Sequence, residues 1–105
     1  MTEISVAELK RRHDSGADFV LLDVREPDEL ATAAVAWARA IPMREIPAQL
    51  GELPRDKPIV CMCHHGGRSE RVTQFLNQNG YDNAVNLAGG IDEWSTEIDP
   101  SVPRY

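Results

Sequence analysis

Short apolar runs alternate with amphipathic segments along this chain, and this alternation constrains its fold more than any other feature. The runs lie at residues 19–22, 58–62 and 84–87. Continuous apolar runs of this length are typical of strands that are buried on both faces of a sheet. Because amphipathic segments separate them, we expect an α/β fold with a mainly parallel sheet of four or five strands, flanked by helices on both faces.

The boundaries of several helices can be predicted from capping residues and prolines. Residues 34–41 are weakly patterned and can form one further strand. The predicted helices are residues 6–13 behind the cap Ser5, residues 27–32 opened by Pro27, residues 43–53 with Pro47 in the first turn, residues 69–78 capped by Ser69, and a closing helix with Ile91 and Trp94.

Length and charge limit the classes of function that this chain can serve. Its 105 residues suit one domain, which we expect to have a core at about 4–98 and an extended tail at 99–105. A net charge of −6 without a basic cluster argues against nucleic-acid partners. No apolar stretch approaches the roughly 20 residues that span a membrane, and the first residues lack the apolar core of a signal peptide. We therefore expect a cytoplasmic protein that does not bind membranes.

Two segments are expected at the same edge of the predicted sheet. Residues 23–26 follow one apolar run and residues 63–69 follow another. Ligand sites of open parallel sheets lie outside the carboxyl ends of the strands. The second segment begins at Cys63 and leads through a double glycine into a helix, so we predict that the functional site lies there.

The residues after Cys63 favour a reactive thiolate. Gly66 and Gly67 permit the backbone conformations with which a loop can wrap its amides around the sulfur. The helix that begins at Ser69 adds partial positive charge, and Arg68 adds a full one. Such surroundings lower the pKa of a thiol from about 8.5 to about 3.5–7.5. We predict a nucleophilic thiolate that can carry a second sulfur atom as a persulfide.

Three separated motifs, FVLLDVREPDE, VCMCHHGGRS and NLAGGIDEW, resemble the single-domain rhodanese family of sulfurtransferases. The resemblance covers residues 4–94 and implies a rhodanese-like fold. It also implies that Cys63 carries the sulfur, that Asp23 and Arg25 lie near the active-site loop with Arg25 in a structural pairing, and that Gly89-Gly90 and Trp94 form a closing signature. The implied loop consists of His64, His65, Gly66, Gly67, Arg68 and Ser69.

One segment departs from the family pattern. Members usually carry a His-Ile-Pro-Gly-Ala-like sequence before the third strand, whereas residues 34–40 of this chain are AVAWARA. This difference affects the local turn and any partner surface there, and leaves the nucleophile unchanged.

Loop length separates sulfurtransferases from the related phosphatases. Four residues separate Cys63 from Arg68, and six separate Cys61 from Arg68. The loop of cysteine-dependent phosphatases encloses a tetrahedral phosphate. Its spacing between cysteine and arginine is one residue longer than that from Cys63 to Arg68 and one residue shorter than that from Cys61 to Arg68. Neither cysteine fits phosphatase chemistry, and the tighter loop suits a persulfide sulfur.

Several individual residues have alternative interpretations. We expect Cys61 to be a packing residue, although it could act as a resolving thiol. His64 and His65 either tune the loop near neutral pH or face water. Arg68 either binds an anion or pairs with Glu70 or Asp92. Trp37 and Trp94 are expected in the core or an interface, and Glu26, Asp28 and Glu29 on a solvated helix face.

The sequence thus predicts a rhodanese-type thiosulfate sulfurtransferase. It would move a sulfane sulfur from thiosulfate or a persulfide donor to a thiol or protein acceptor through a Cys63 persulfide, without a metal or organic cofactor. Two alternatives are a non-catalytic interaction module built on the same loop and a soft-metal-binding protein that uses Cys61, Cys63, His64 and His65. The sequence does not identify the physiological donor and acceptor or the oligomeric state.

Overall fold

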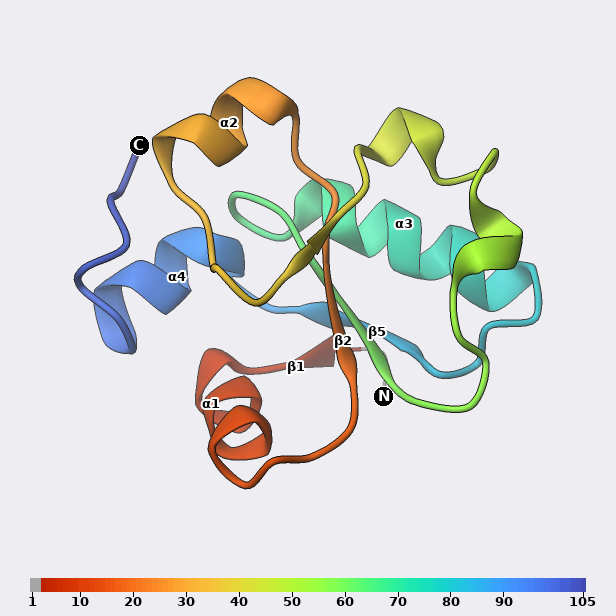
Figure 1. Ribbon diagram of the computed structural model, residues 1–105, viewed down its shortest axis with the longest axis horizontal. Coiled ribbons are helices and arrows are strands. Elements are labelled where there is room, and N and C mark those ends of the chain that lie inside the picture. Colours follow the sequence, from red (N-terminus) through yellow and green to blue (C-terminus); the bar gives the residue numbers. More distant parts are fainter. Residues whose placement is uncertain (1–2) are drawn as a thin grey trace.

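The computed structural model describes residues 3–105 and contains a five-stranded, all-parallel sheet (Figure 1). The strand order is β1-β5-β4-β2-β3. This arrangement confirms the expected α/β fold. The strands are β1 (Glu3–Ile4), β2 (Val20–Asp23), β3 (Arg39–Ala40), β4 (Ile59–Met62) and β5 (Ala84–Leu87).

Four helices connect or follow the strands, and most begin as the sequence predicts. The Ser5 hydroxyl caps the first helix by accepting a hydrogen bond from the Glu8 amide at 3.1 Å, and Pro27 is the first residue of the second. The helices are α1 (Val6–Asp14), α2 (Pro27–Thr32), α3 (Gly67–Gln78) and α4 (Gly90–Glu97). Within residues 3–105 no helix is long and apolar enough to cross a membrane.

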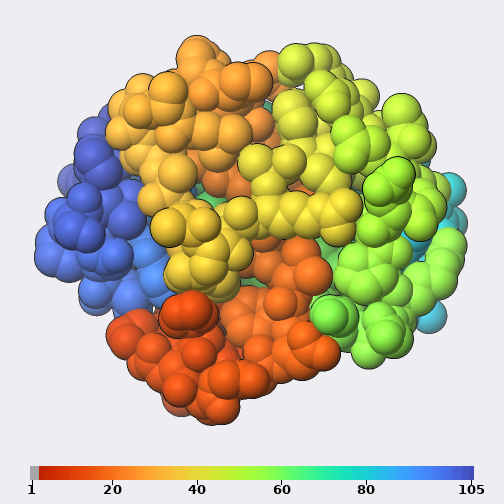
Figure 2. All heavy atoms as spheres, in the orientation of Figure 1, coloured from red at the N-terminus to blue at the C-terminus, as the bar shows by residue number. Residues whose placement is uncertain are grey.

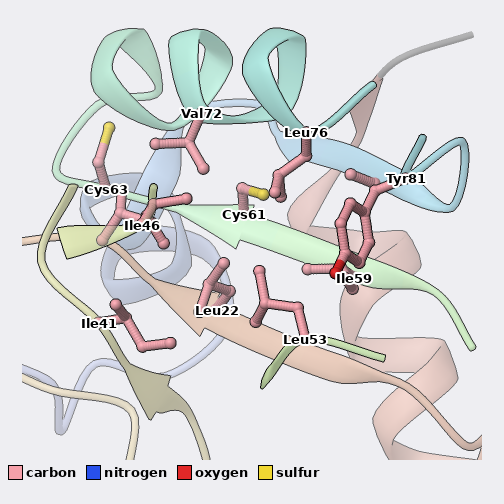
Figure 3. Close-up of a cluster of buried hydrophobic side chains, with 12 residues drawn as sticks. Leu22, Ile41, Ile46, Leu53, Ile59, Cys61, Cys63, Val72, Leu76 and Tyr81 are labelled. Carbon is pink, nitrogen blue, oxygen red and sulfur yellow. The ribbon is translucent and has the colours of Figure 1, made fainter. Parts of the chain in front are cut away.

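Helices cover both faces of the sheet because successive strand residues point in opposite directions. In β4, Ile59 and Cys61 pack in the cluster on the α3 face (Figure 3). Val60 and Met62 pack in the opposite cluster, to which α1 and α4 contribute. All four side chains are fully buried, which explains why this strand is a continuous apolar run in the sequence.

The helix predicted at residues 43–53 is wrong. The structure has two short 3₁₀ helices there, η1 (Met43–Glu45) and η2 (Leu50–Glu52). In an α-helix that started at Met43, the ring of Pro47 would clash with the carbonyl group of Met43, four residues earlier. The apolar spacing nevertheless predicts burial, since Ile46 and Leu53 are both in the core.

The strand considered for residues 34–41 is much shorter than that. Within this segment only Arg39–Ala40 forms a strand, which pairs with β2 at the edge of the sheet. A turn precedes it, in which the Ala38 amide donates to the Val35 carbonyl group at 3.0 Å. In the space-filling view, the yellow segment that runs from β3 into η1 lies on the surface facing the viewer (Figure 2). The sequence did not predict β1, which pairs with β5 at the opposite edge.

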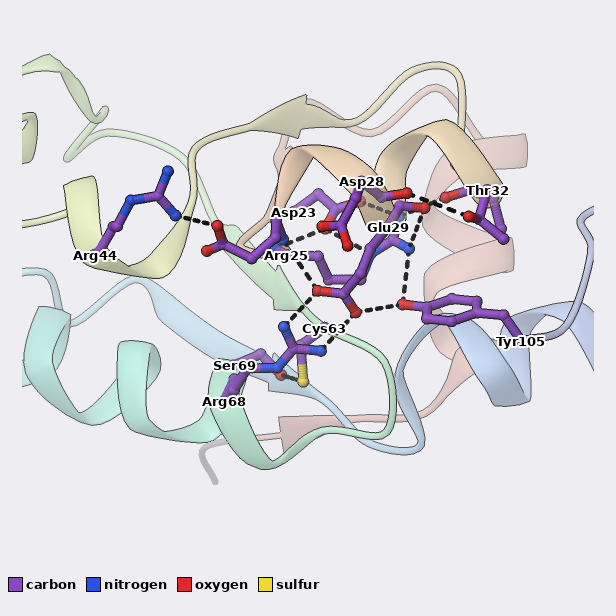
Figure 4. A network of polar contacts seen from close by, with 12 residues as sticks. Asp23, Arg25, Asp28, Glu29, Thr32, Arg44, Cys63, Arg68, Ser69 and Tyr105 are labelled. Atoms are coloured by element: carbon purple, nitrogen blue, oxygen red, sulfur yellow. Dashed lines mark hydrogen bonds and ion pairs between the residues drawn. The ribbon is translucent and has the colours of Figure 1, made fainter.

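Residues 99–105 form neither helix nor strand, but some of them contact the domain. The Val102 side chain is buried, and its carbonyl group accepts a hydrogen bond from the Ser95 hydroxyl. The Arg104 guanidinium pairs with Asp92 at 3.0 Å. The last residue, Tyr105, reaches the loop after β4 (Figure 4).

Candidate active site

The loop after β4 brings Cys63 to the carboxyl edge of the sheet, beside the end of β2. Asp23 and Met62 are paired in adjacent strands, so the segments that follow them leave the sheet at the same place. This geometry confirms that the two predicted segments share one edge. The loop is short, because α3 already begins at Gly67.

Two glycines give the loop its shape. Gly66 has a φ of +116° and is the residue that precedes α3. Gly90, at the start of α4, has a φ of +58°, and a Cβ atom there would lie 2.6 Å from the Cys63 carbonyl oxygen and 2.5 Å from that of His64. Since the Ile91 amide donates to the Cys63 carbonyl group at 2.9 Å, the beginning of α4 holds the beginning of the loop.

Two details of the predicted loop are wrong. Ser69 is not the helix cap; it lies in the first turn of α3, and Gly66 precedes the helix instead. Gly67 needs no unusual backbone conformation, because it is the first helical residue and a Cβ atom would meet no atom within 4 Å. Ser69 faces inward from the first helical turn and contacts the cysteine.

The Cys63 sulfur lies at the centre of converging hydrogen-bond donors. Its Sγ accepts from the Gly66 amide at 3.1 Å and from the Ser69 hydroxyl at 3.3 Å (Figure 4). Burial of the thiol raises its pKa, but the Ser69 hydroxyl and the backbone amides of Ser69, Gly66 and Arg68 outweigh burial and bring the pKa of Cys63 below its usual 9.0. Hydrogen bonds to the charged form of a group favour ionisation. The loop therefore favours a thiolate.

Cys61 has the opposite environment although it is two residues away. Its side chain is fully buried in the core on the α3 face. Burial raises the pKa of the Cys61 thiol from 9.0 to about 11, against a smaller lowering by Thr73. The packing role is confirmed, and a resolving role is disfavoured because this thiol stays protonated at neutral pH.

Arg68 pairs with a residue that the sequence analysis placed on a solvated face. Its guanidinium donates to both carboxylate oxygens of Glu29, at 2.6 and 2.8 Å, and not to Glu70 or Asp92 (Figure 4). The Glu29 side chain is only 17% exposed. The hydrogen bonds from Arg68, helped by one from Tyr105, hold the pKa of Glu29 well below its usual 4.5. The pair has no net charge.

Arg25 lies beneath this pair as a buried structural residue. Its guanidinium donates to the Asp23 carboxylate at 2.7 and 2.9 Å and to the Ala33 carbonyl group at 2.8 Å. Both charged side chains are almost wholly inaccessible. The structural pairing implied for Arg25 is confirmed, and it fixes the backbone from β2 to the end of α2.

Tyr105 connects these groups to the two histidines. Its hydroxyl donates to Glu29 at 2.7 Å and accepts from Arg25 at 3.0 Å. Its ring stacks on the His64 ring, with centroids 3.8 Å apart and planes inclined by 6°. The ring centroids of His64 and His65 are 3.9 Å apart. Burial, followed by the proximity of His65, lowers the pKa of His64 below 6.5, so this ring is neutral at pH 7.

A cavity of about 310 Å³ opens over the cysteine. It offers a cationic, hydrogen-bonding wall next to a thiol whose surroundings favour the thiolate, which suits a small anionic substrate. Within residues 3–105 no three His, Cys, Asp or Glu side chains are placed so that they could hold a metal ion. The cavity is lined by Cys63, His64, His65, Gly67, Arg68 and Arg71.

Four contributors to this site were not predicted from the sequence. Glu29 and Tyr105 reach Arg68 and His64 from distant parts of the chain, Arg71 lines the cavity, and the Asn86 Oδ1 atom lies 2.5 Å from the Ser69 hydroxyl oxygen. The position of Asn86 in a strand that is otherwise apolar is the one local signal that could have identified it. A buried polar residue of this kind requires a partner.

Comparison with known proteins agrees with this geometry. The chain matches the model of the rhodanese-like domain over residues 5–97. It is 36% identical over 102 residues to a sulfurtransferase of Allochromatium vinosum, covering 97% of this chain and 95% of the relative. It is 37% identical over 98 residues to the putative sulfurtransferase YtwF of Bacillus subtilis, covering 93% of this chain and 94% of the relative.

Solved structures show the same arrangement. The human single-domain sulfurtransferase TSTD1 superposes with a TM-score of 0.83 at 29% identity, covering 92% of this chain and 97% of the human protein. The family model, the full-length relatives and the shared fold lead to one conclusion: this chain belongs to the family of rhodanese-like domains.

Proposed function

We propose that this protein is a sulfurtransferase that carries a sulfane sulfur as a persulfide on Cys63. The observation that carries the proposal is the set of hydrogen bonds from Gly66 and Ser69 to the Cys63 sulfur, which favours the thiolate. Relatives with sulfurtransferase names match the chain over nearly its whole length, which supports the same activity.

In the first half-reaction the Cys63 thiolate attacks the outer sulfur of the donor. With thiosulfate, a bond forms between Sγ and the outer sulfur, the bond between the two thiosulfate sulfurs breaks, and sulfite leaves with the bonding electron pair. With an organic persulfide, the corresponding thiolate leaves. The new terminal sulfur projects into the cavity, where the loop amides and the start of α3 stabilise its negative charge.

In the second half-reaction a nucleophile removes the terminal sulfur. Cyanide forms thiocyanate, and a thiol of a small molecule or a protein forms a new persulfide; in each case the Cys63 thiolate is regenerated. These steps need only the cysteine and the donors of the loop. Cys61 and Cys63 are both free thiols, which suits a reducing compartment, and we place the reaction in the cytoplasm.

Steady-state kinetics of thiocyanate formation test this proposal. We expect parallel lines in double-reciprocal plots for thiosulfate and cyanide, the pattern of a ping-pong mechanism. Cys63→Ala loses the activity, whereas Cys61→Ala, the matched control, keeps it within about threefold because its thiol stays protonated. Activity in Cys63→Ala would assign the chemistry elsewhere. A folded protein that forms thiocyanate from neither thiosulfate nor a persulfide donor would favour the interaction module instead.

A further inference from the structure

Two cavities meet at Arg71, next to the proposed nucleophile. One is the 310 Å³ cavity over Cys63, called here the sulfur cavity. The other, of about 200 Å³, is called the apolar cavity. Arg71 lines both, so the two cavities are neighbours that share this side chain. The remaining walls of the apolar cavity are Met43, Ile46, Pro47, Val72 and Phe75.

The apolar cavity begins close to the reactive sulfur. Ile46 and Val72 belong to the same packed cluster as Cys63, and Figure 3 shows them beside it at the end of β4. Phe75 lies one helical turn after Arg71, so both side chains project from the same face of α3. The other side is closed by η1 and Pro47, whose backbone departs from the predicted helix.

The charge needed to bind an anion in this region comes from Arg71. The Arg68 guanidinium also lines the sulfur cavity, but both of its hydrogen-bonded nitrogens are committed to Glu29. Arg71 is exposed and forms no ion pair or side-chain hydrogen bond within residues 3–105. In a chain with a net charge of −6, such a cation is a local attraction for a negative group.

These neighbouring features describe a ligand. A molecule bound at Cys63 has the Arg71 guanidinium and the side chains of the apolar cavity as neighbours. We propose that Arg71 and the apolar cavity bind the organic part of the sulfur donor, an anionic molecule with an apolar group beyond its negative charge. Arg71 is then a specificity-determining residue. This inference rests on the proposed function and names the class of donor for it.

Thiosulfonates are suitable probes because they combine a transferable sulfur, a negative charge and an organic group. In benzenethiosulfonate, the transferable sulfur is followed by the sulfonyl oxygens and then by the ring. The Cys63 thiolate takes the outer sulfur, the bond between the two sulfur atoms of the donor breaks, and benzenesulfinate leaves with the electron pair. Methanethiosulfonate undergoes the same step without a ring, and thiosulfate has no organic part.

The experiment compares rates of persulfide loading on the full chain in single turnovers. Each rate is divided by the rate of the same donor with a small thiolate in solution, which removes differences in leaving-group reactivity. We expect a normalised preference for benzenethiosulfonate over methanethiosulfonate of about tenfold or more, the discrimination of an apolar pocket. Equal normalised rates would overturn the inference. This comparison uses the unmodified protein and does not depend on the folding of any variant.

Two variants assign the preference to the two parts of the site. Arg71→Ala is expected to slow loading by both thiosulfonates about tenfold, the effect of losing a charged hydrogen bond. Arg11→Ala, which removes the same charge from the exposed side of α1, serves as the control and is expected to change loading less than twofold. Equal slowing in both variants would attribute the effect to net charge and contradict the role of Arg71.

Met43→Gln places a polar side chain of similar size in the wall of the apolar cavity. It is expected to reduce the preference for the ring to below about threefold, because loading by benzenethiosulfonate slows more than loading by methanethiosulfonate. A preference that persists in this folded variant would contradict a role for the apolar cavity. If an organic persulfide loads the wild-type protein and none of these three donors does, the inference fails and the proposed function stands. If the organic persulfide does not load it either, both fail.

Discussion

At the scale of single residues, two cysteines two positions apart show how strongly the surroundings of a thiol change its pKa. Cys63 receives hydrogen bonds from an amide and a hydroxyl, and its pKa falls. Cys61 points into the packed core, and its pKa rises to about 11. The same side chain is therefore a candidate nucleophile in one position and an apolar packing group in the other.

The Ser69 hydroxyl is the largest of the contributions that lower the pKa of Cys63, and its removal gives a direct prediction. In Ser69→Ala the pH profile of Cys63 alkylation by iodoacetamide is expected to shift to higher pH, because the thiolate loses a donor. The alkylation rate at pH 7 falls about 3- to 10-fold. Fragmentation of the peptide that contains both cysteines by tandem mass spectrometry separates label on Cys63 from label on Cys61. Ser15→Ala, at the exposed C-terminal end of α1, is the control, and an unchanged profile in Ser69→Ala would refute this role.

At the scale of elements, the strands and most helices were predictable because their patterns are local. Apolar runs and capping residues gave β2, β4, β5, α1 and α3 to within a few residues. The helix predicted from Met43 to Leu53 was wrong. The spacing of its apolar residues indicates which side chains are buried, but it does not determine the backbone conformation. Pro47 prevents an α-helix in this segment, because the proline ring would clash with the Met43 carbonyl group.

The junction between the loop and α3 depends on one of its two glycines. Gly66→Ala puts a Cβ atom on a residue with a φ of +116°, and we expect a loss of about 1–3 kcal/mol in the free energy of unfolding together with slower Cys63 alkylation. Gly67→Ala is the matched control. It places the methyl group in open space on a helical residue, so stability is expected to stay the same or to rise by about 0.4–1 kcal/mol. Urea denaturation measures both, and equal losses would contradict this account of the loop.

At the scale of the whole molecule, the candidate site joins parts of the chain that no local pattern connects. Glu29 and Arg68 are 39 positions apart, and Tyr105 is 76 positions from Glu29. The position of Cys63 and its loop at the carboxyl edge of the sheet was predictable, because a motif carries these residues. The partner of Arg68 and the ring that covers His64 were not, since they result from the packing of α2 and the final residues around the loop.

The Glu29–Arg68 pair gives a prediction for the pH dependence of stability. Because the pKa of Glu29 is lower in the folded chain than in the unfolded one, the unfolded chain binds more protons as the pH falls below the usual 4.5. The stabilisation is therefore complete above that pH and is lost during acidification. Relative to wild type, Glu29→Gln is expected to be about 1 kcal/mol less stable at pH 7, as for a partly exposed pair, with the difference shrinking in acid.

Thermal unfolding of both proteins between pH 7 and pH 3 measures this difference. Asp28→Asn, which removes a neighbouring carboxylate of the same helix that is not bonded to Arg68, is the control. A difference between wild type and Glu29→Gln that stays constant over this range would show that the pair contributes through packing rather than charge.

The central claim is that Cys63 carries a sulfur atom, and intact-mass spectrometry of the whole protein tests it most directly. After brief exposure to thiosulfate or an organic persulfide, the wild-type protein is expected to gain the mass of one sulfur atom, to lose it on addition of cyanide, and to carry it on the peptide that contains Cys63. Cys63→Ala is expected to gain nothing. A gain of mass by Cys63→Ala, or no gain by the wild-type protein with either donor, would contradict the account.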